Sequence, residues 1–85
     1  MRIKISSLNV AEFDDVAEWV AQEMDESVGD VAIAITENMP KSPAEFNGLV
    51  PMRYVCDAVR AAYEDAVALK LGAELGFATY VRIPL

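Results

Sequence analysis

Hydrophobic and polar residues alternate near both ends of the chain. Residues 2–6, RIKIS, place two isoleucines on one face and polar side chains on the other, which predicts a half-buried strand. Residues 77–83, FATYVRI, alternate in the same way before Pro84, so a last strand is predicted there. Residues 30–37, DVAIAITE, are apolar on both faces and rich in β-branched side chains, which favours a central strand.

Two long helices are predicted between these strands. The first begins at Asn9, which has the spacing of a helix cap relative to Glu12, and it stops at Gly29. The second runs from about Pro51 to Glu74 and has apolar residues at helical spacing on its core side. These core positions are Val55, Val59, Ala62, Ala66 and Leu69.

A long connection is predicted over residues 38–50, which are rich in proline and glycine. Within it, Ser42, Pro43 and Glu45 have the spacing of a cap, a first-turn residue and a capping-box partner, which predicts a single helical turn. The apolar residues in and just after this connection are expected to cover the open end of the sheet, with a second contact surface as the alternative. They are Phe46, Leu49, Val50 and Met52.

The predicted order of elements is β-α-β-α-β. This order favours an α+β or small α/β fold, in which a three-stranded sheet carries both helices on one face because right-handed crossovers place them together. A chain of 85 residues suffices for one compact domain over residues 1–85 and is too short for two.

Charge is distributed unevenly along the chain. The protein has 14 acidic and 7 basic residues, which gives a formal net charge of −7. Residues 11–27, AEFDDVAEWVAQEMDES, contain seven acids and no base, and nine acids lie between Lys4 and Lys41 without a single Lys or Arg. In the second predicted helix, by contrast, bases and acids alternate at three- and four-residue steps. The overall balance argues against direct contact with nucleic acid or anionic membranes and favours a basic partner.

The first predicted helix has one apolar stripe and one acidic face. The stripe, its expected core contact, consists of Phe13, Val16, Ala17, Val20 and Met24. Trp19, the only tryptophan, falls outside this stripe, and its neighbours four residues away are Asp15 and Glu23. A regular helix therefore places Trp19 inside the acidic face. Seven carboxylates over roughly 21 Å give about one charge per 3 Å, close to the ~3.4 Å spacing of phosphates along one DNA strand.

These features predict a protein that acts by binding. We expect an inhibitor or decoy that presents the acidic helix to the basic groove of a nucleic-acid-processing protein. Phages use small acidic proteins in this way against CRISPR and restriction systems, which is the setting that this mechanism suggests. Trp19 would anchor the contact, and the acids would supply charge complementarity. The expected partner-binding residues are Glu12, Asp14, Asp15, Glu18, Trp19, Glu23, Asp25 and Glu26.

Alternatives to this hypothesis stay open at the level of sequence. Acidic helix faces commonly serve solubility. The protein would then be a homodimeric or adaptor module that binds a cognate protein through apolar surface, and Trp19 would be a boundary residue partly covered by residues 38–50. An electrostatic decoy loses affinity steeply as salt rises, whereas an apolar interface does not.

Side chains suited to catalysis or metal binding are scarce. Cys56 is the only cysteine and histidine is absent, so we expect no disulfide, no zinc site and no Cys-His pair. The acids lack the spacing of a calcium-binding loop, and the glycines do not form a phosphate-binding loop. We therefore expect no catalytic residue, cofactor or metal. The lone cysteine and the lack of a long apolar run favour a cytoplasmic location without membrane contact.

Overall fold

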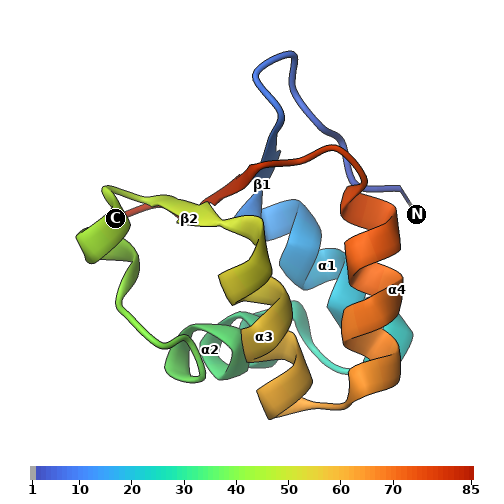
Figure 1. The fold of residues 1–85 in the computed structure, drawn as a ribbon. Helices are drawn as coiled ribbons and strands as arrows, with labels where there is room; N and C mark the ends of the chain where they lie inside the picture. Colours follow the sequence, from blue (N-terminus) through green and yellow to red (C-terminus); the bar gives the residue numbers. More distant parts are fainter. Residues whose placement is uncertain (1) are drawn as a thin grey trace.

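The computed structural model describes residues 2–85, which form four α-helices, one short 3-10 helix and a three-stranded sheet (Figure 1). In chain order the elements are β1 (Val10–Glu12), α1 (Phe13–Met24), α2 (Val28–Glu37), η1 (Pro43–Phe46), β2 (Leu49–Pro51), α3 (Met52–Ala62), α4 (Asp65–Leu75) and β3 (Tyr80–Arg82). The protein is thus a small α+β fold, but the predicted β-α-β-α-β order with two helices is wrong.

The sheet is mixed, with β3 between the other two strands. β3 runs parallel to β1 and antiparallel to β2. Val81 in β3 pairs with Ala11 on one side and Val50 on the other, and all three side chains are fully buried. The middle residue of each strand therefore points into the core, and Figure 1 shows the helices on one side of the sheet.

The helices pack in a ring in which α1 contacts α2 and α4, and α3 contacts the same two helices. Aliphatic side chains fill the space that they enclose. The largest fully buried residues of the helices are Val16, Val20, Val31, Ile35, Val55, Val59, Leu71 and Leu75. The apolar stripe predicted for the first helix is confirmed, because its first four residues are buried and Met24 packs partly against the core.

The beginning of the chain differs from the prediction for residues 2–6. Only Ile5 makes a bridge, an isolated one with Ala11, so the strand in this region is β1 and not residues 2–6. Asn9 has φ 61° and lies in a tight turn, where its N–H donates to the Ser6 carbonyl at 2.9 Å. Asn9 is therefore a turn residue rather than a helix cap, as its tolerance for the left-handed region allows.

Residues 30–37 form most of helix α2, so the predicted central strand is wrong. The Ser27 side-chain oxygen accepts a hydrogen bond from the Asp30 N–H at 3.2 Å, and this N-cap starts the helix. Gly29 lies inside α2 and does not stop α1, which ends at Met24 with Asp25 in the left-handed region at φ 55°. Val31 and Ile35 pack on one helical stripe, and this tertiary contact outweighs the strand propensity of the segment.

The second predicted helix is two helices, α3 and α4, that meet at Tyr63 and Glu64. A straight helix over residues 51–74 would be about 36 Å long. That exceeds the longest dimension of the molecule, 29 Å, so the chain has to turn for both halves to reach the core. The turn shifts the helical register: Val55 and Val59 are buried as predicted, whereas Leu69 is 69% exposed.

The connection between α2 and β2 forms the predicted single turn, η1. The Ser42 N–H donates to Glu45 Oε2 at 3.2 Å, which is half of the expected capping box. Gly48 follows at φ 81°, and a Cβ there would lie 2.9 Å from the Ile83 carbonyl oxygen, so only glycine fits this approach of β2 to the end of the chain. The predicted last strand is shortened to β3, because Phe77 lies in the preceding turn and is 91% exposed.

Candidate functional site

The seven acids of residues 11–27 do not share one helix. Glu12 lies in β1, Asp25 caps the C-terminus of α1, and Glu26 lies in the link to α2. Helix α1 itself has 12 residues and carries four of the acids, Asp14, Asp15, Glu18 and Glu23. The expected continuous row of seven carboxylates on a single helix is therefore wrong.

Two of these acids are neutralised by bases that are distant in sequence. Glu12 Oε2 lies 3.3 Å from an Arg82 guanidinium nitrogen in β3, and Glu23 Oε2 lies 3.4 Å from Lys70 Nζ in α4. Local sequence could not reveal these pairs, because both bases come from elements that fold back against β1 and α1.

We call residues 12–37 the acidic segment. Its other acids have no ion pair among the residues that the structure describes. These unpaired acids are Asp14, Asp15, Glu18, Asp25, Glu26, Asp30 and Glu37. All are exposed except Asp15, which is half-buried. The segment contains no Lys or Arg, so its charge is not balanced locally.

The link between α1 and α2 lies close to the turn between α3 and α4. The pKa of Tyr63 in that turn is raised, first by burial and then by the nearby carboxylates of Glu26 and Asp30. Glu64, exposed and adjacent to Tyr63, adds another acid at this end of the molecule. Negative charge therefore extends from the acidic segment to the α3–α4 turn.

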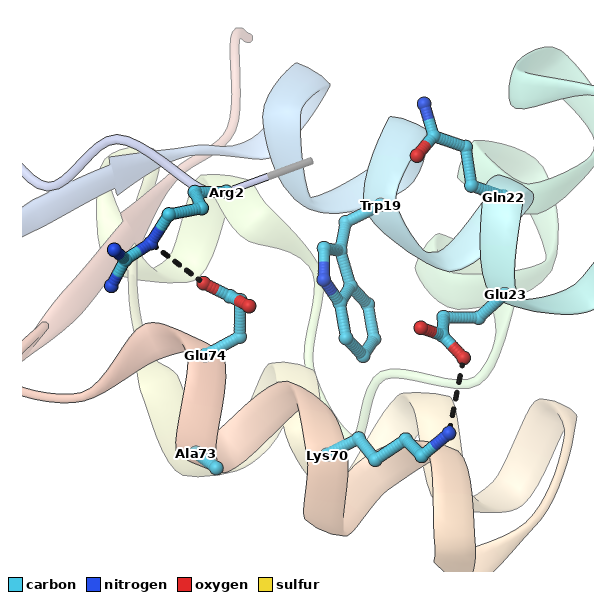
Figure 2. A pocket seen from close by; sticks show the side chains of 7 residues that line it. All are labelled: Arg2, Trp19, Gln22, Glu23, Lys70, Ala73 and Glu74. Atoms are coloured by element: carbon cyan, nitrogen blue, oxygen red, sulfur yellow. Dashed lines mark hydrogen bonds and ion pairs between the residues drawn. The ribbon is translucent and has the colours of Figure 1, made fainter.

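The sequence predicted that Trp19 stands on the acidic face of the first helix. This prediction is wrong, because only 6% of Trp19 is exposed. Residues 38–50 are not what covers it: the indole lies between α1 and α4, at the bottom of a surface groove of about 460 Å³ (Figure 2). We call this the Trp19 groove. Its lining residues are Arg2, Trp19, Gln22, Glu23, Lys70, Ala73 and Glu74. Sequence reasoning missed Lys70 and Glu74 because α4 was predicted as the second half of one longer helix, and it missed Arg2 because residues 2–6 were predicted as a strand.

Two ion pairs flank the indole in the Trp19 groove. Arg2 Nε lies 4.0 Å from Glu74 Oε2 on one side, and Lys70 Nζ lies 3.4 Å from Glu23 Oε2 on the other. Among residues 2–85, no fully buried side-chain nitrogen or oxygen lacks a partner. The indole Nε1 makes no hydrogen bond with these residues. Within residues 2–85, therefore, no group accepts the indole N–H.

Of the four apolar residues predicted to cover the open end of the sheet, Leu49 and Val50 belong to strand β2 of the sheet itself. Val50 is fully buried, Phe46 and Met52 pack partly against the core, and the Phe46 and Tyr54 rings lie 5.5 Å apart. Leu49, 39% exposed, is the member most open to solvent. Three of the four residues thus contribute to the core, and Leu49 lies at the surface.

Helix α2 exposes two apolar side chains, of which Ile33 belonged to the predicted central strand. Ile33 is 59% exposed and Val28 is 42% exposed. Ile33 points away from the buried stripe of Val31 and Ile35, and a shallow depression beside it is lined by Ala32 and Thr36. This face of α2 is a candidate apolar contact.

Cys56 has the surroundings of a structural thiol. It is buried, its pKa is raised by burial and then by Asp57, and its Sγ lies 3.5 Å from Met52 Sδ. A nucleophilic cysteine needs a lowered pKa, so the geometry does not favour a reaction at this sulfur. Within residues 2–85, no three Asp, Glu or Cys side chains converge as a metal-ligand cluster. Over the same range, no helix has the length and apolar character to cross a membrane.

The chain matches no protein-family model, no curated protein and no solved structure. The features that bear on function are therefore the acidic segment, the Trp19 groove and the exposed face of α2.

Proposed function

We propose that the protein is an inhibitor or decoy that binds the basic groove of a nucleic-acid-processing protein through its acidic segment. The observation that carries this proposal is the set of seven unpaired acids on α1, α2 and their link, in a segment without a base. A surface of one sign attracts a surface of the other, accelerates association and disfavours partners of like charge. The proposed setting is the cytoplasm, in a defence or counter-defence system such as that of a phage.

The roles of individual residues differ from the sequence hypothesis. Asp14 and Glu18 lie one helical turn apart on exposed positions of α1 and carry no ion pair in the described chain, so they would supply most of the contact charge. Glu12 and Glu23 already have partners, and their charge is partly screened. Trp19 is buried and would not reach a flat partner surface. Binding by this surface would depend mainly on charge.

The competing proposal is a homodimeric or adaptor module that binds through apolar surface. The exposed Ile33 and Val28 of α2 favour it. A single exposed isoleucine is common on protein surfaces, whereas a stretch without bases that carries nine acids is not. The electrostatic proposal therefore rests on the less common feature.

Capture of the partner from host lysate on the tagged protein tests the electrostatic proposal. A basic nucleic-acid-binding protein should be retained at low salt, released between about 50 and 200 mM salt, and displaced by its own nucleic acid. Glu18→Lys should weaken its affinity roughly threefold to fivefold, the equivalent of about 0.7–1 kcal/mol. Glu64→Lys is the matched control, because Glu64 is also exposed and without an ion pair in the described chain but lies outside the acidic segment.

Several outcomes would contradict the electrostatic proposal. If Glu18→Lys and Glu64→Lys weakened affinity for the partner equally, binding would depend only on the net charge of the protein. Recovery of the protein's own copies, or of a partner that survives high salt and is lost with Ile33→Lys, would establish the apolar module instead.

A further inference from the structure

We infer that the Trp19 groove binds an arginine residue of the basic partner, an inference that rests on the proposed function and deepens it. In this arrangement the guanidinium lies against Glu23, beside the edge of the indole that lines the groove. The peptide carbonyl of the same residue or of its neighbour accepts a hydrogen bond from Trp19 Nε1. The groove would thus read one residue of the partner, while the acidic segment attracts the partner as a whole.

The indole N–H is the first support for this site. Trp19 is only 6% exposed, and it lines the groove. No group of residues 2–85 accepts a hydrogen bond from its N–H. A donor at the wall of a groove can exchange water for an acceptor that a partner brings. A peptide carbonyl, with its two lone pairs, is the acceptor that any partner protein offers.

The two carboxylates of the groove are the second support. In Figure 2, Glu74 and Glu23 lie on opposite sides of the indole and reach toward the space around it. Only 25% of the Glu74 side chain and 34% of the Glu23 side chain are exposed, so both are partly desolvated. Partly desolvated carboxylates attract a cation more strongly than fully solvated ones.

The present counterions of these carboxylates are easily exchanged. The Arg2 side chain is 94% exposed and reaches Glu74 only at 4.0 Å, and the Lys70 side chain is 66% exposed. Exposed ion pairs of this kind contribute little to stability, so a cation from a partner can replace them. Lys70 and Arg2 would then swing outward and uncover the edge of the indole.

Arginine fits this groove better than lysine. Its planar guanidinium donates in a fork to a carboxylate and is more weakly hydrated than an ammonium group. Lysine would meet the charge of Glu23 but offers no planar fork of donors. Nucleic-acid-binding proteins carry arginines at high density in their grooves, so the proposed partner would offer this residue.

The test follows the indole itself while a short arginine peptide is added. Because Trp19 is the only tryptophan, the protein gives one indole N–H cross-peak in a 1H–15N NMR spectrum. We expect this peak to shift saturably with acetyl-Gly-Arg-Gly-amide, with a dissociation constant on the order of 1 mM. The lysine analogue should bind at least about fivefold more weakly, and the neutral citrulline analogue should leave the peak in place.

Matched variants separate the groove from general charge. Glu23→Gln and Glu74→Gln should each weaken the arginine peptide by roughly fivefold or more, because each removes a carboxylate of the groove. Glu64→Gln carries the same change in charge outside the groove and should leave peptide binding nearly unchanged. All three variants keep Trp19 in place, and their native spectra verify the fold.

The result also separates this inference from the proposed function. An indole peak that stays in place, or equal binding of the arginine and lysine peptides, overturns the groove site. Salt-sensitive capture of the partner would in that case still support the acidic segment. If the indole responds to arginine but no basic partner is captured from lysate, the groove site stands and the decoy function falls.

Discussion

The helix pairs α1–α2 and α3–α4 have similar size, but acidic and basic side chains balance only in α3–α4. In α3 and α4, Arg60 contacts Asp57 at 2.7 Å and Asp65 at 3.2 Å, so that one guanidinium ties the two helices together across their turn. In α1 and α2 the link carries Asp25 and Glu26 with no base nearby in sequence. One pair uses charge to fix its own geometry, and the other does not.

This difference indicates that the unbalanced charge of the acidic segment is not needed for folding. Carboxylates in close proximity repel one another, and those near the C-terminal end of α1 oppose the helix dipole. The helix pair α3–α4 packs in the same ring with balanced charge, so the fold does not require imbalance. Any use of the acidic segment therefore lies in solubility or binding.

The largest test of this comparison is Trp19→Ala. Trp19 belongs to α1 but packs beneath α4, so it joins the two helix pairs. Its removal should lower the free energy of unfolding by about 3–5 kcal/mol, measured by urea denaturation. Phe77→Ala is the aromatic control: Phe77 is 91% exposed, and its loss should cost less than about 0.5 kcal/mol. If the two variants were equally stable, Trp19 would be a surface residue, as the sequence suggested.

The charges that tie α3 to α4 give the second test. Arg60→Gln removes both ion pairs of Arg60 while it keeps most of the side-chain length. Because the guanidinium is half exposed, we expect a loss of only about 0.5–1 kcal/mol in the free energy of unfolding. The loss should shrink as salt rises, since screening weakens the pairs in the parent protein. A loss that persists in high salt would mean that packing of the Arg60 stem, not its charge, joins the helices.

Removal of a charge from the acidic segment should raise the free energy of unfolding rather than lower it. Asp25→Asn removes a negative charge from the C-terminal end of α1 and leaves a residue that tolerates the left-handed region. We expect the protein to gain about 0.3–0.5 kcal/mol of unfolding free energy at low salt. Asp57→Asn makes the same change in charge but removes a partner of Arg60, so it should destabilise the protein. Thermal unfolding of both variants shows whether the signs differ, and equal signs would contradict the contrast between the helix pairs.

Features set by nearby residues were predictable from sequence. The buried stripe of α1 depends on helical spacing alone, and the single turn of η1 depends on Ser42, Pro43 and Glu45, which are adjacent in the chain. The uneven charge is likewise a property of sequence. In each case the physical cause acts within a few residues.

Features set by packing between elements were not predictable. The β-branched residues of α2 suggested a strand, yet Val31 and Ile35 are buried as a helical stripe between α1 and α3. Trp19 is buried because the turn at Tyr63 brings α4 over α1, and a continuous helix over residues 51–74 would not have done so. The groove around Trp19 was missed for the same reason.

The smallest expected effect concerns Tyr63, where the two helix pairs meet. The pKa of Tyr63 is raised above its ordinary value of about 10, by burial and then by Glu26 and Asp30. The folded state therefore holds the phenolic proton more tightly than the unfolded state. The stability linked to this proton is fully present below about pH 10 and is lost as pH rises through the folded-state pKa.

The difference in phenolate absorbance between the protein and its Tyr63→Phe variant isolates the titration of Tyr63 from that of the other two tyrosines. Glu26→Gln removes one of the carboxylates that raise the pKa, so it should move the titration of Tyr63 toward lower pH. Glu37→Gln makes the same change in charge on α2 without being a cause of the shift, and it should leave the titration in place. If both variants moved it equally, net charge alone would govern Tyr63. A shift with Glu26→Gln alone would place the charge of the acidic segment directly against the turn between α3 and α4.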